Sequence, residues 1–200
     1  MLFQVLAERG FFPIERLAEF GKPGSVFHEH PPKPGYIPGV EAATGSLGHG
    51  LPMALGMAIA QRIQGSNSRC YALLSDGECN EGSVWETAAL AGERHIANIV
   101  AIIDENGFRN DGENSMYTRG PAIADVWRAF NWNVIEVDGH DTGQIEAAFA
   151  TAHKCREQPT AIVAKTVKGR GVSFMEANND WHHNRITSKT LDQILAEFDG

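Results

Sequence analysis

From residue 70 onward, short apolar segments alternate with amphipathic segments. The apolar segments are rich in β-branched residues and cover residues 70–74, 99–103, 133–137 and 160–164. The segments between them carry apolar or small residues at helical spacing and lie near 81–95, 121–130 and 142–156. Apolar strands separated by amphipathic helices are typical of βαβ units. The pattern therefore predicts an α/β fold with a mostly parallel sheet and helices on both of its faces.

The first seventy residues follow other patterns. Residues 2–9 form the end of an amphipathic helix, which Gly10 closes. Residues 21–41 are rich in Gly and Pro and predict a long irregular loop. Residues 51–63 predict a helix with an apolar stripe. The stripe consists of Leu51, Leu55, Ile59 and Ile63.

Length and composition narrow the class of protein. We expect residues 1–200 to form a single domain, because this length can bury about 70% of the surface of the unfolded chain. With 17 basic and 25 acidic residues the net charge is −8, which argues against nucleic acid and anionic membrane as partners. The three cysteines are widely spaced and odd in number, which indicates free thiols and a cytoplasmic protein. The sequence shows neither a signal peptide nor a membrane-spanning segment.

Polar side chains follow the ends of the predicted strands. Asp76 follows the first strand, Asn106 the second, Gly139–His140 the third and Lys165–Thr166 the fourth. Because the carboxyl ends of parallel strands meet at one edge of the sheet, we expect these residues to form a ligand site there.

The residue types at this edge suit a metal ion and a phosphate. The carboxylate of Asp76 and the carboxamide of Asn106 are hard oxygen ligands for Mg²⁺, with Ca²⁺ as an alternative. Gly77 allows close approach of the backbone to a phosphate, and a helix expected to begin near Glu81 would direct free N–H groups towards it. A second glycine-rich loop, residues 44–50, precedes the helix of residues 51–63 and offers a similar anion cradle.

Two motifs in this region resemble a known family. Asp-Gly-Glu-x-x-Glu-Gly at residues 76–82 and Asp-x-Asn-x-x-x-x-Asp-Gly at residues 104–112 resemble the thiamine-diphosphate motif of transketolases, particularly the bacterial and archaeal type that is split into two subunits. The resemblance extends from Gly10 to Thr187 and covers about the first third of a full-length transketolase. It implies transfer of a two-carbon ketol unit from a ketose phosphate to an aldose phosphate, with thiamine diphosphate and Mg²⁺ as cofactors.

The resemblance also assigns roles to individual residues. Asp76, Asn106 and the backbone carbonyl of Phe108 are the implied metal ligands. The implied cofactor contacts are Gly45, Leu47, Gly48, His49, Gly50, Asp76, Gly77, Glu78 and Asn106, where His49 replaces a family Gln and Ser75 stands where many members have Gly. His30 and His182 match histidines that face the donor sugar, and Glu81 matches a glutamate at the subunit interface.

A partner is part of the same expectation. In the family, a C-terminal subunit with a pyrimidine-binding domain completes the cofactor site, in a heterotetramer of two chains of each kind. We therefore expect this chain to be inactive alone. The sequence also begins after the family's Ser-Lys-Gly-His element, whose histidine faces the cofactor and the donor.

Three alternatives differ from this interpretation. Another thiamine enzyme, such as a deoxyxylulose-phosphate synthase or a 2-oxo acid dehydrogenase component, could share the diphosphate-binding half. A truncated subunit that binds and regulates a partner without catalysis is also open. A nicotinamide-binding Rossmann domain is rejected, because the glycine motif at residues 45–50 does not follow a clear strand.

Overall fold

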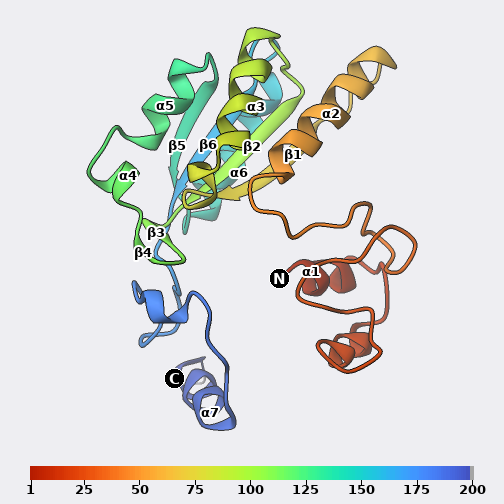
Figure 1. The fold of residues 1–200 in the computed structure, drawn as a ribbon, viewed down its shortest axis with the longest axis vertical. Coiled ribbons are helices and arrows are strands. Elements are labelled where there is room, and N and C mark those ends of the chain that lie inside the picture. Colours follow the sequence, from red (N-terminus) through yellow and green to blue (C-terminus); the bar gives the residue numbers. More distant parts are fainter. Residues whose placement is uncertain (199–200) are drawn as a thin grey trace. The chain divides into compact units, whose positions relative to one another are not determined.

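The computed structural model describes residues 1–198, which divide into two compact units. The first unit covers residues 1–47 and the second begins at Gly48 (Figure 1). Whether residues 1–200 function as a single domain stays a prediction.

The second unit is built on a parallel sheet of four strands. In spatial order these are β1 (Cys70–Ser75), β2 (Ile99–Glu105), β6 (Thr160–Lys165) and β5 (Asn133–Asp138). All three strand pairs are parallel, and all four strands coincide with predicted segments. Ser75 pairs with Asp104, and Glu105 pairs with Lys165. The carboxyl ends of the strands therefore lie at one edge, as expected.

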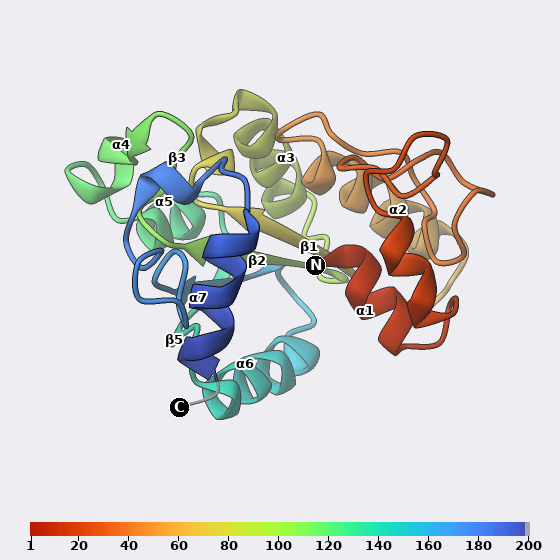
Figure 2. The same ribbon diagram turned by 90° about the horizontal axis from the view of Figure 1, so that it is seen from below.

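Helices cover both faces of this sheet (Figures 1 and 2). Helices α2 (Gly50–Ile63), α3 (Gly82–Glu93) and α5 (Ile123–Ala129) contribute to one apolar core, together with residues such as Leu74 and Ile103 of the sheet. Helix α6 (Thr142–Lys154) contributes to a second core with Val100 and Ile162. Val100 and Ile103 face different cores because side chains alternate along a strand. The predicted fold class is confirmed.

Aromatic side chains join α3 to α5. Trp127 is fully buried, and its ring lies 4.7 Å from that of Trp132. The indole N–H of Trp132 donates a hydrogen bond of 2.9 Å to the carbonyl of Ala88 in α3. Asp141 is the N-cap of α6, and its side chain accepts a hydrogen bond from the backbone N–H of Gln144.

Some elements depart from the predictions. The stripe on α2 is buried at Leu51 and Leu55, whereas Ile63 at the end of the helix is 82% exposed, so the apolar stripe is only partly buried. The segment after β2, for which the sequence pattern predicted no strand, contains a short hairpin of β3 (Phe108–Arg109) and β4 (Gly112–Glu113), followed by α4 (Ser115–Thr118). A short 3₁₀ helix, η2 (Glu78–Asn80), also precedes α3.

The first unit has its own core. It contains α1 (Leu2–Glu8) and a 3₁₀ helix, η1 (Ile14–Glu19). Phe3 and Phe12 both pack edge-on against Phe27, which is fully buried. Residues 21–41 contain no helix or strand, as predicted.

The chain after β6 is mostly irregular. It contains a 3₁₀ helix, η3 (Asn179–Trp181), and then α7 (Ser188–Phe198). Glu197 in α7 accepts hydrogen bonds of 2.7 Å from the N–H and the hydroxyl of Ser173. Within residues 1–198, no helix has the length and apolar character needed to span a membrane.

Candidate functional site

Asp76 lies directly after β1 and is 1% exposed. Its backbone N–H donates to the carbonyl of Asp104 at 3.0 Å, which holds it beside the end of β2. Its Oδ2 accepts hydrogen bonds from the N–H of Gly107 at 3.0 Å and from Asn114 Nδ2 at 3.3 Å. Burial raises the pKa of this carboxyl group, and the hydrogen bonds from Asn114 and Gly107 oppose the rise.

Two asparagines fix the orientation of this carboxylate. Asn114 is fully buried and donates to Asp76 while its own Oδ1 accepts a 3.1 Å hydrogen bond from Asn80 Nδ2. Asn80 also donates to the carbonyl of Gly77 at 3.0 Å. Sequence reasoning did not single out Asn114 or Asn80, because their partners are brought together by the fold rather than by any recognisable spacing.

Asn106, Gly77 and Phe108 lie around Asp76. The side-chain oxygen of Asn106 accepts a hydrogen bond of 3.0 Å from the N–H of Phe108, which turns the chain after β2. A methyl group added at Gly77 would lie 3.0 Å from the carbonyl oxygen of Phe108. The backbone angle φ of Gly77 is −61°, which any residue can adopt. Glycine is therefore needed here for the close approach of the two backbones and not for its conformational freedom.

One oxygen of Asp76 suits a metal ion. Its Oδ1 is buried and has no hydrogen-bond partner among residues 1–198. A buried carboxylate oxygen without a partner is costly, and a bound cation would remove that cost. Together with the carboxamide of Asn106 and the Phe108 carbonyl, it offers the oxygen ligands that Mg²⁺ accepts. No cluster of three or more His, Cys, Asp or Glu side chains within residues 1–198 offers a competing metal site.

The glycine-rich loop is joined to the start of α3. The N–H of Gly48 donates to Glu78 Oε1 at 2.9 Å, and its carbonyl accepts from the hydroxyl of Ser83 at 2.9 Å. Gly48 has φ of +78°, and a side chain there would collide with Ser83 and Glu81. Glu78 thus positions Gly48, and the backbone N–H of Glu78 donates a hydrogen bond to the hydroxyl of Ser75.

Other predicted residues lie at the starts of helices. His49 is the N-cap of α2 and Gly50 is its first residue. Glu81 is the N-cap of α3, is exposed, and makes no side-chain capping hydrogen bond. Leu47, the last residue of the first unit, is 57% exposed.

In the first unit, His30 lies against Gly45. A methyl group added at Gly45 would lie 3.0 Å from the ring of His30. Gly45 also has φ of +142°, a backbone conformation that other residues rarely adopt. The structure therefore brings together two of the predicted site residues that are fifteen positions apart in the sequence.

His182 follows η3 and is paired with a lysine. Its Nδ1 lies 3.1 Å from Lys168 Nζ. Desolvation lowers the pKa of His182 below its usual value, and the charges of Lys168 and His183 lower it further. The same segment contacts the loop after β2, since Asn179 Nδ2 donates to the carbonyl of Asn110 at 3.1 Å. A neutral imidazole can both donate and accept a hydrogen bond.

Comparison with known proteins identifies the family of this chain. The sequence model of the family described as "Transketolase, thiamine diphosphate binding domain" matches residues 1–198. The chain is 34% identical over 198 residues to the 6-deoxy-6-sulfo-D-fructose transketolase subunit SqwG of Clostridium sp. (strain MSTE9), covering 99% of this chain and 72% of that protein. It is also 34% identical over 196 residues to an apulose-4-phosphate transketolase subunit of Phocaeicola vulgatus, covering 98% of this chain and 69% of that protein.

A solved structure has the same fold. The transketolase from Leishmania mexicana superposes with a TM-score of 0.84 at 28% sequence identity, covering 92% of this chain and 29% of that one. The chain therefore spans less than a third of that enzyme.

The fold and the matched family model define a thiamine-diphosphate-binding domain. The chain belongs to the transketolase family, and it corresponds to the subunit that carries this domain, part of a transferase.

Proposed function

We propose that this chain is the N-terminal subunit of a Mg²⁺- and thiamine-diphosphate-dependent transketolase. It moves a two-carbon ketol unit from a ketose to an aldose, each with a terminal anionic group, and it works with a C-terminal subunit that completes the site. The observation that carries the proposal is the buried carboxylate of Asp76, with one oxygen fixed by Gly107 and Asn114 and the other without a partner in residues 1–198.

Three oxygens of this chain would hold the metal ion. Asp76 Oδ1, the side chain of Asn106 and the backbone carbonyl of Phe108 are the proposed ligands, with Ca²⁺ as an alternative to Mg²⁺. When bound, thiamine diphosphate supplies the stabilisation of a carbanion that ketol transfer requires. Gly77 lets the backbone approach the diphosphate, and the starts of α2 and α3 place positive dipole ends and N–H groups beside the glycine loop.

The histidines supply contacts to the donor. His182, whose pKa is lowered by desolvation, can hydrogen-bond to a donor oxygen on which charge develops. Lys168 next to it adds positive charge at the same point. His30 is proposed as a second contact to donor hydroxyls, and Glu81 as the residue that couples to the partner subunit.

The relatives support the substrate class. One is named for a sulfonated sugar and another for a sugar phosphate. Both sugars carry an anionic group, so we propose the same for the donor of this chain, with an aldose phosphate as acceptor.

The same relatives support the proposal of a partner subunit. Their names mark them as subunits, and this chain covers most of their length but only 29% of the Leishmania mexicana enzyme. We propose a heterotetramer of two such chains and two C-terminal subunits, which is a closed symmetric assembly, and a cytoplasmic location.

The metal site is tested with Asp76→Ala. Removal of a direct ligand should weaken Mg²⁺-dependent binding of thiamine diphosphate by at least about 100-fold, since even loss of a group that only supports a ligand costs 10- to 100-fold. Calorimetry on the reconstituted complex measures the affinity, and circular dichroism checks the fold. Asp192→Ala, which removes a carboxylate from α7, is the control and should bind normally. Unchanged affinity in Asp76→Ala would contradict the proposal.

A further inference from the structure

A cavity of about 220 Å³ lies at the edge of the sheet opposite to Asp76. Its lining includes Arg69, which precedes β1, Asn98, which precedes β2, and Arg156, which precedes β6. Because the strands are parallel, residues before them lie at the amino edge, away from the carboxyl edge that carries the cofactor site. The cavity is therefore separate from the site described above.

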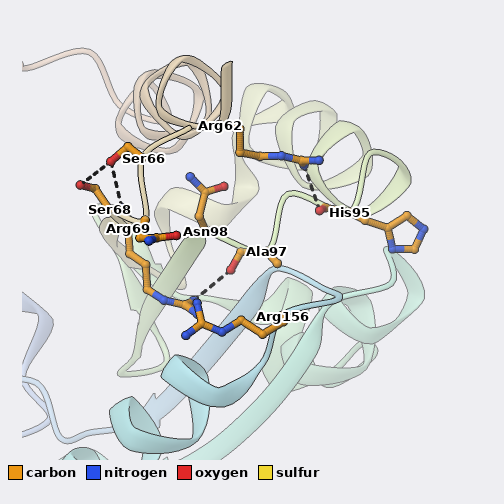
Figure 3. Close-up of a pocket in the computed structure, with 9 residues that line it drawn as sticks. Arg62, Ser66, Ser68, Arg69, His95, Ala97, Asn98 and Arg156 are labelled. Carbon is orange, nitrogen blue, oxygen red and sulfur yellow. Dashed lines mark hydrogen bonds between the residues drawn. The ribbon is translucent and has the colours of Figure 1, made fainter. Parts of the chain in front are cut away.

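The lining is positively charged in a protein of net charge −8. Three arginines line the cavity, Arg62, Arg69 and Arg156, and they reach it from different elements (Figure 3). None of the nine lining residues is Asp or Glu. No ion pair within residues 1–198 joins any of these three guanidinium groups to a carboxylate. Their charge is thus not neutralised by this part of the chain.

Two of the arginines are held in place by hydrogen bonds to backbone carbonyls. Arg69 donates to the backbone carbonyls of Ala97 at 2.9 Å, His153 at 3.0 Å and Cys155 at 3.1 Å. Arg62 Nη1 donates to the carbonyls of Arg94 and His95 at 3.3 and 3.1 Å. These bonds fix the positions of the guanidinium groups and leave other N–H donors of each for a ligand, since arginine has five. Because backbone carbonyls are uncharged, these hydrogen bonds do not neutralise the positive charge of the two guanidinium groups.

Arg156 differs from the other two arginines because its side chain is not held by other residues of the range 1–198. Its exposed side chain makes no hydrogen bond or ion pair there. With Arg69 and Asn67 it also lines an adjacent cavity of about 400 Å³, whose other lining residues are Tyr71 and His153. Two guanidinium groups thus face the same two spaces, and an anion between them would offset their repulsion.

We propose that this cavity binds a phosphate group, either inorganic phosphate or the phosphate of a small sugar phosphate. Arginine matches the geometry of phosphate oxygens through paired N–H donors. A cavity of 220 Å³ is smaller than the roughly 300–1,000 Å³ of sites for drug-sized ligands, so it fits a small anion rather than a nucleotide. The adjacent cavity accommodates the sugar of a phosphate ester. This inference does not rest on the proposed function.

The test uses the full chain labelled with ¹⁵N and titrated with sodium phosphate against sodium chloride at constant ionic strength. Saturable shifts are expected at the backbone amides of residues 67–69, 97 and 98 and at the Nε–H signals of Arg69 and Arg156. A parallel titration with a pentose 5-phosphate distinguishes the two sources: tighter binding than inorganic phosphate identifies the ester as the ligand, and equal binding identifies free phosphate.

Two variants separate a built site from general attraction. Arg156→Gln removes a lining charge without removing a structural bond and should weaken phosphate binding by about tenfold or more, the equivalent of one charge-assisted hydrogen bond. Lys154→Gln removes the same charge two positions away, outside the lining, and should change affinity by less than about twofold. Equal effects of the two variants, absence of saturable binding, or shifts confined to residues 76–78 would each overturn the proposal.

Discussion

At the scale of single residues, the site depends on a side chain that does not touch any ligand in our proposal. Asn114 is completely buried and holds Asp76 Oδ2 on one side and Asn80 on the other. It therefore directs the unpartnered Oδ1 of Asp76 towards the place where a metal ion would bind. Groups that orient metal ligands in this way contribute strongly to affinity.

Asn114→Ala tests this positioning role. We expect Mg²⁺ affinity to fall by about 10- to 100-fold, because the carboxylate loses one of its two orienting donors. The unfolding free energy should fall by roughly 1–3 kcal/mol, since Asp76 and Asn80 each lose a buried or part-buried hydrogen bond to Asn114. Magnesium titrations at saturating thiamine diphosphate measure the first effect and denaturant unfolding the second. Asn184→Ala on the exposed loop is the control; equal losses there would show that the effect is not specific.

The pKa of His182 provides a second prediction at this scale. Desolvation lowers it, and the positive charges of Lys168 and His183 lower it further. Lys168→Gln removes one of these charges, so the pKa should rise part of the way towards the usual value of about 6.5. A larger fraction of imidazolium below pH 7 should then shift the acid limb of kcat to higher pH. NMR titration of the imidazole checks the pKa, with Lys189→Gln as control. An unchanged titration would show that Lys168 does not act on His182.

At the scale of elements, α3 connects the sheet, the glycine loop and α5. Its start is held to Gly48 through Ser83, and its middle receives the indole hydrogen bond of Trp132. Near its end, Gly92 lies directly against the backbone of the turn after α5, and a methyl group there would be 1.8 Å from the carbonyl oxygen of Phe130. A displacement of α3 would therefore disturb both its packing in the core and its hydrogen bond to Gly48.

Gly92→Ala should separate α3 from this turn. The added methyl group would overlap the carbonyl oxygen of Phe130, so the two backbones must move apart, and we expect a loss of stability of roughly 1–3 kcal/mol or more, as for overpacked cores. Gly56→Ala in α2 is the matched control, since a methyl group there meets nothing within 4 Å. That change should stabilise the chain by roughly 0.5–1 kcal/mol through helix propensity. Thermal and urea unfolding of the two variants measure the difference, and similar stabilities would contradict the packing argument.

At the scale of the whole molecule, the proposed site is shared between two chains. In our proposal, this chain supplies the metal ligands, the glycine loops and two histidines that face the donor, and the C-terminal subunit supplies the pyrimidine-binding domain. Carbanion chemistry depends on positioning and on exclusion of water, which half a site cannot supply. Catalysis should therefore belong to the assembly.

Assembly and cofactor binding should be coupled. If the C-terminal subunit tightens binding of thiamine diphosphate by some factor, the cofactor must tighten the association of the two chains by the same factor, because linkage is reciprocal. Sedimentation of the chain with and without the partner, each with and without thiamine diphosphate and Mg²⁺, measures both. Ketol transfer by an assembly of this chain alone would contradict the proposal.

The sequence alone determined the four strands of the sheet and the motif at residues 76–82 and 104–112. The apolar segments of the four strands stand out because they supply the layer between two sets of helices, and each carboxyl end is marked by a polar residue such as Asp76 or Asn106. The residues that a motif fixes locally, such as the N-cap Asp141, could be predicted for a related reason, because the contacts involved span only a few positions.

The tertiary structure decided what depends on distant residues meeting. Asn114 and Asp76 are 38 positions apart, and no spacing in the sequence reveals that they share a hydrogen bond. Ile63 has the helical spacing of a core residue, yet it lies at the end of α2, where its side chain is left exposed. The three arginines of the opposite edge come from separate elements, and their shared cavity exists only once the starts of the strands are aligned. Periodicity records which face of an element is apolar, whereas the partner of each polar atom is set by the packing of the whole fold.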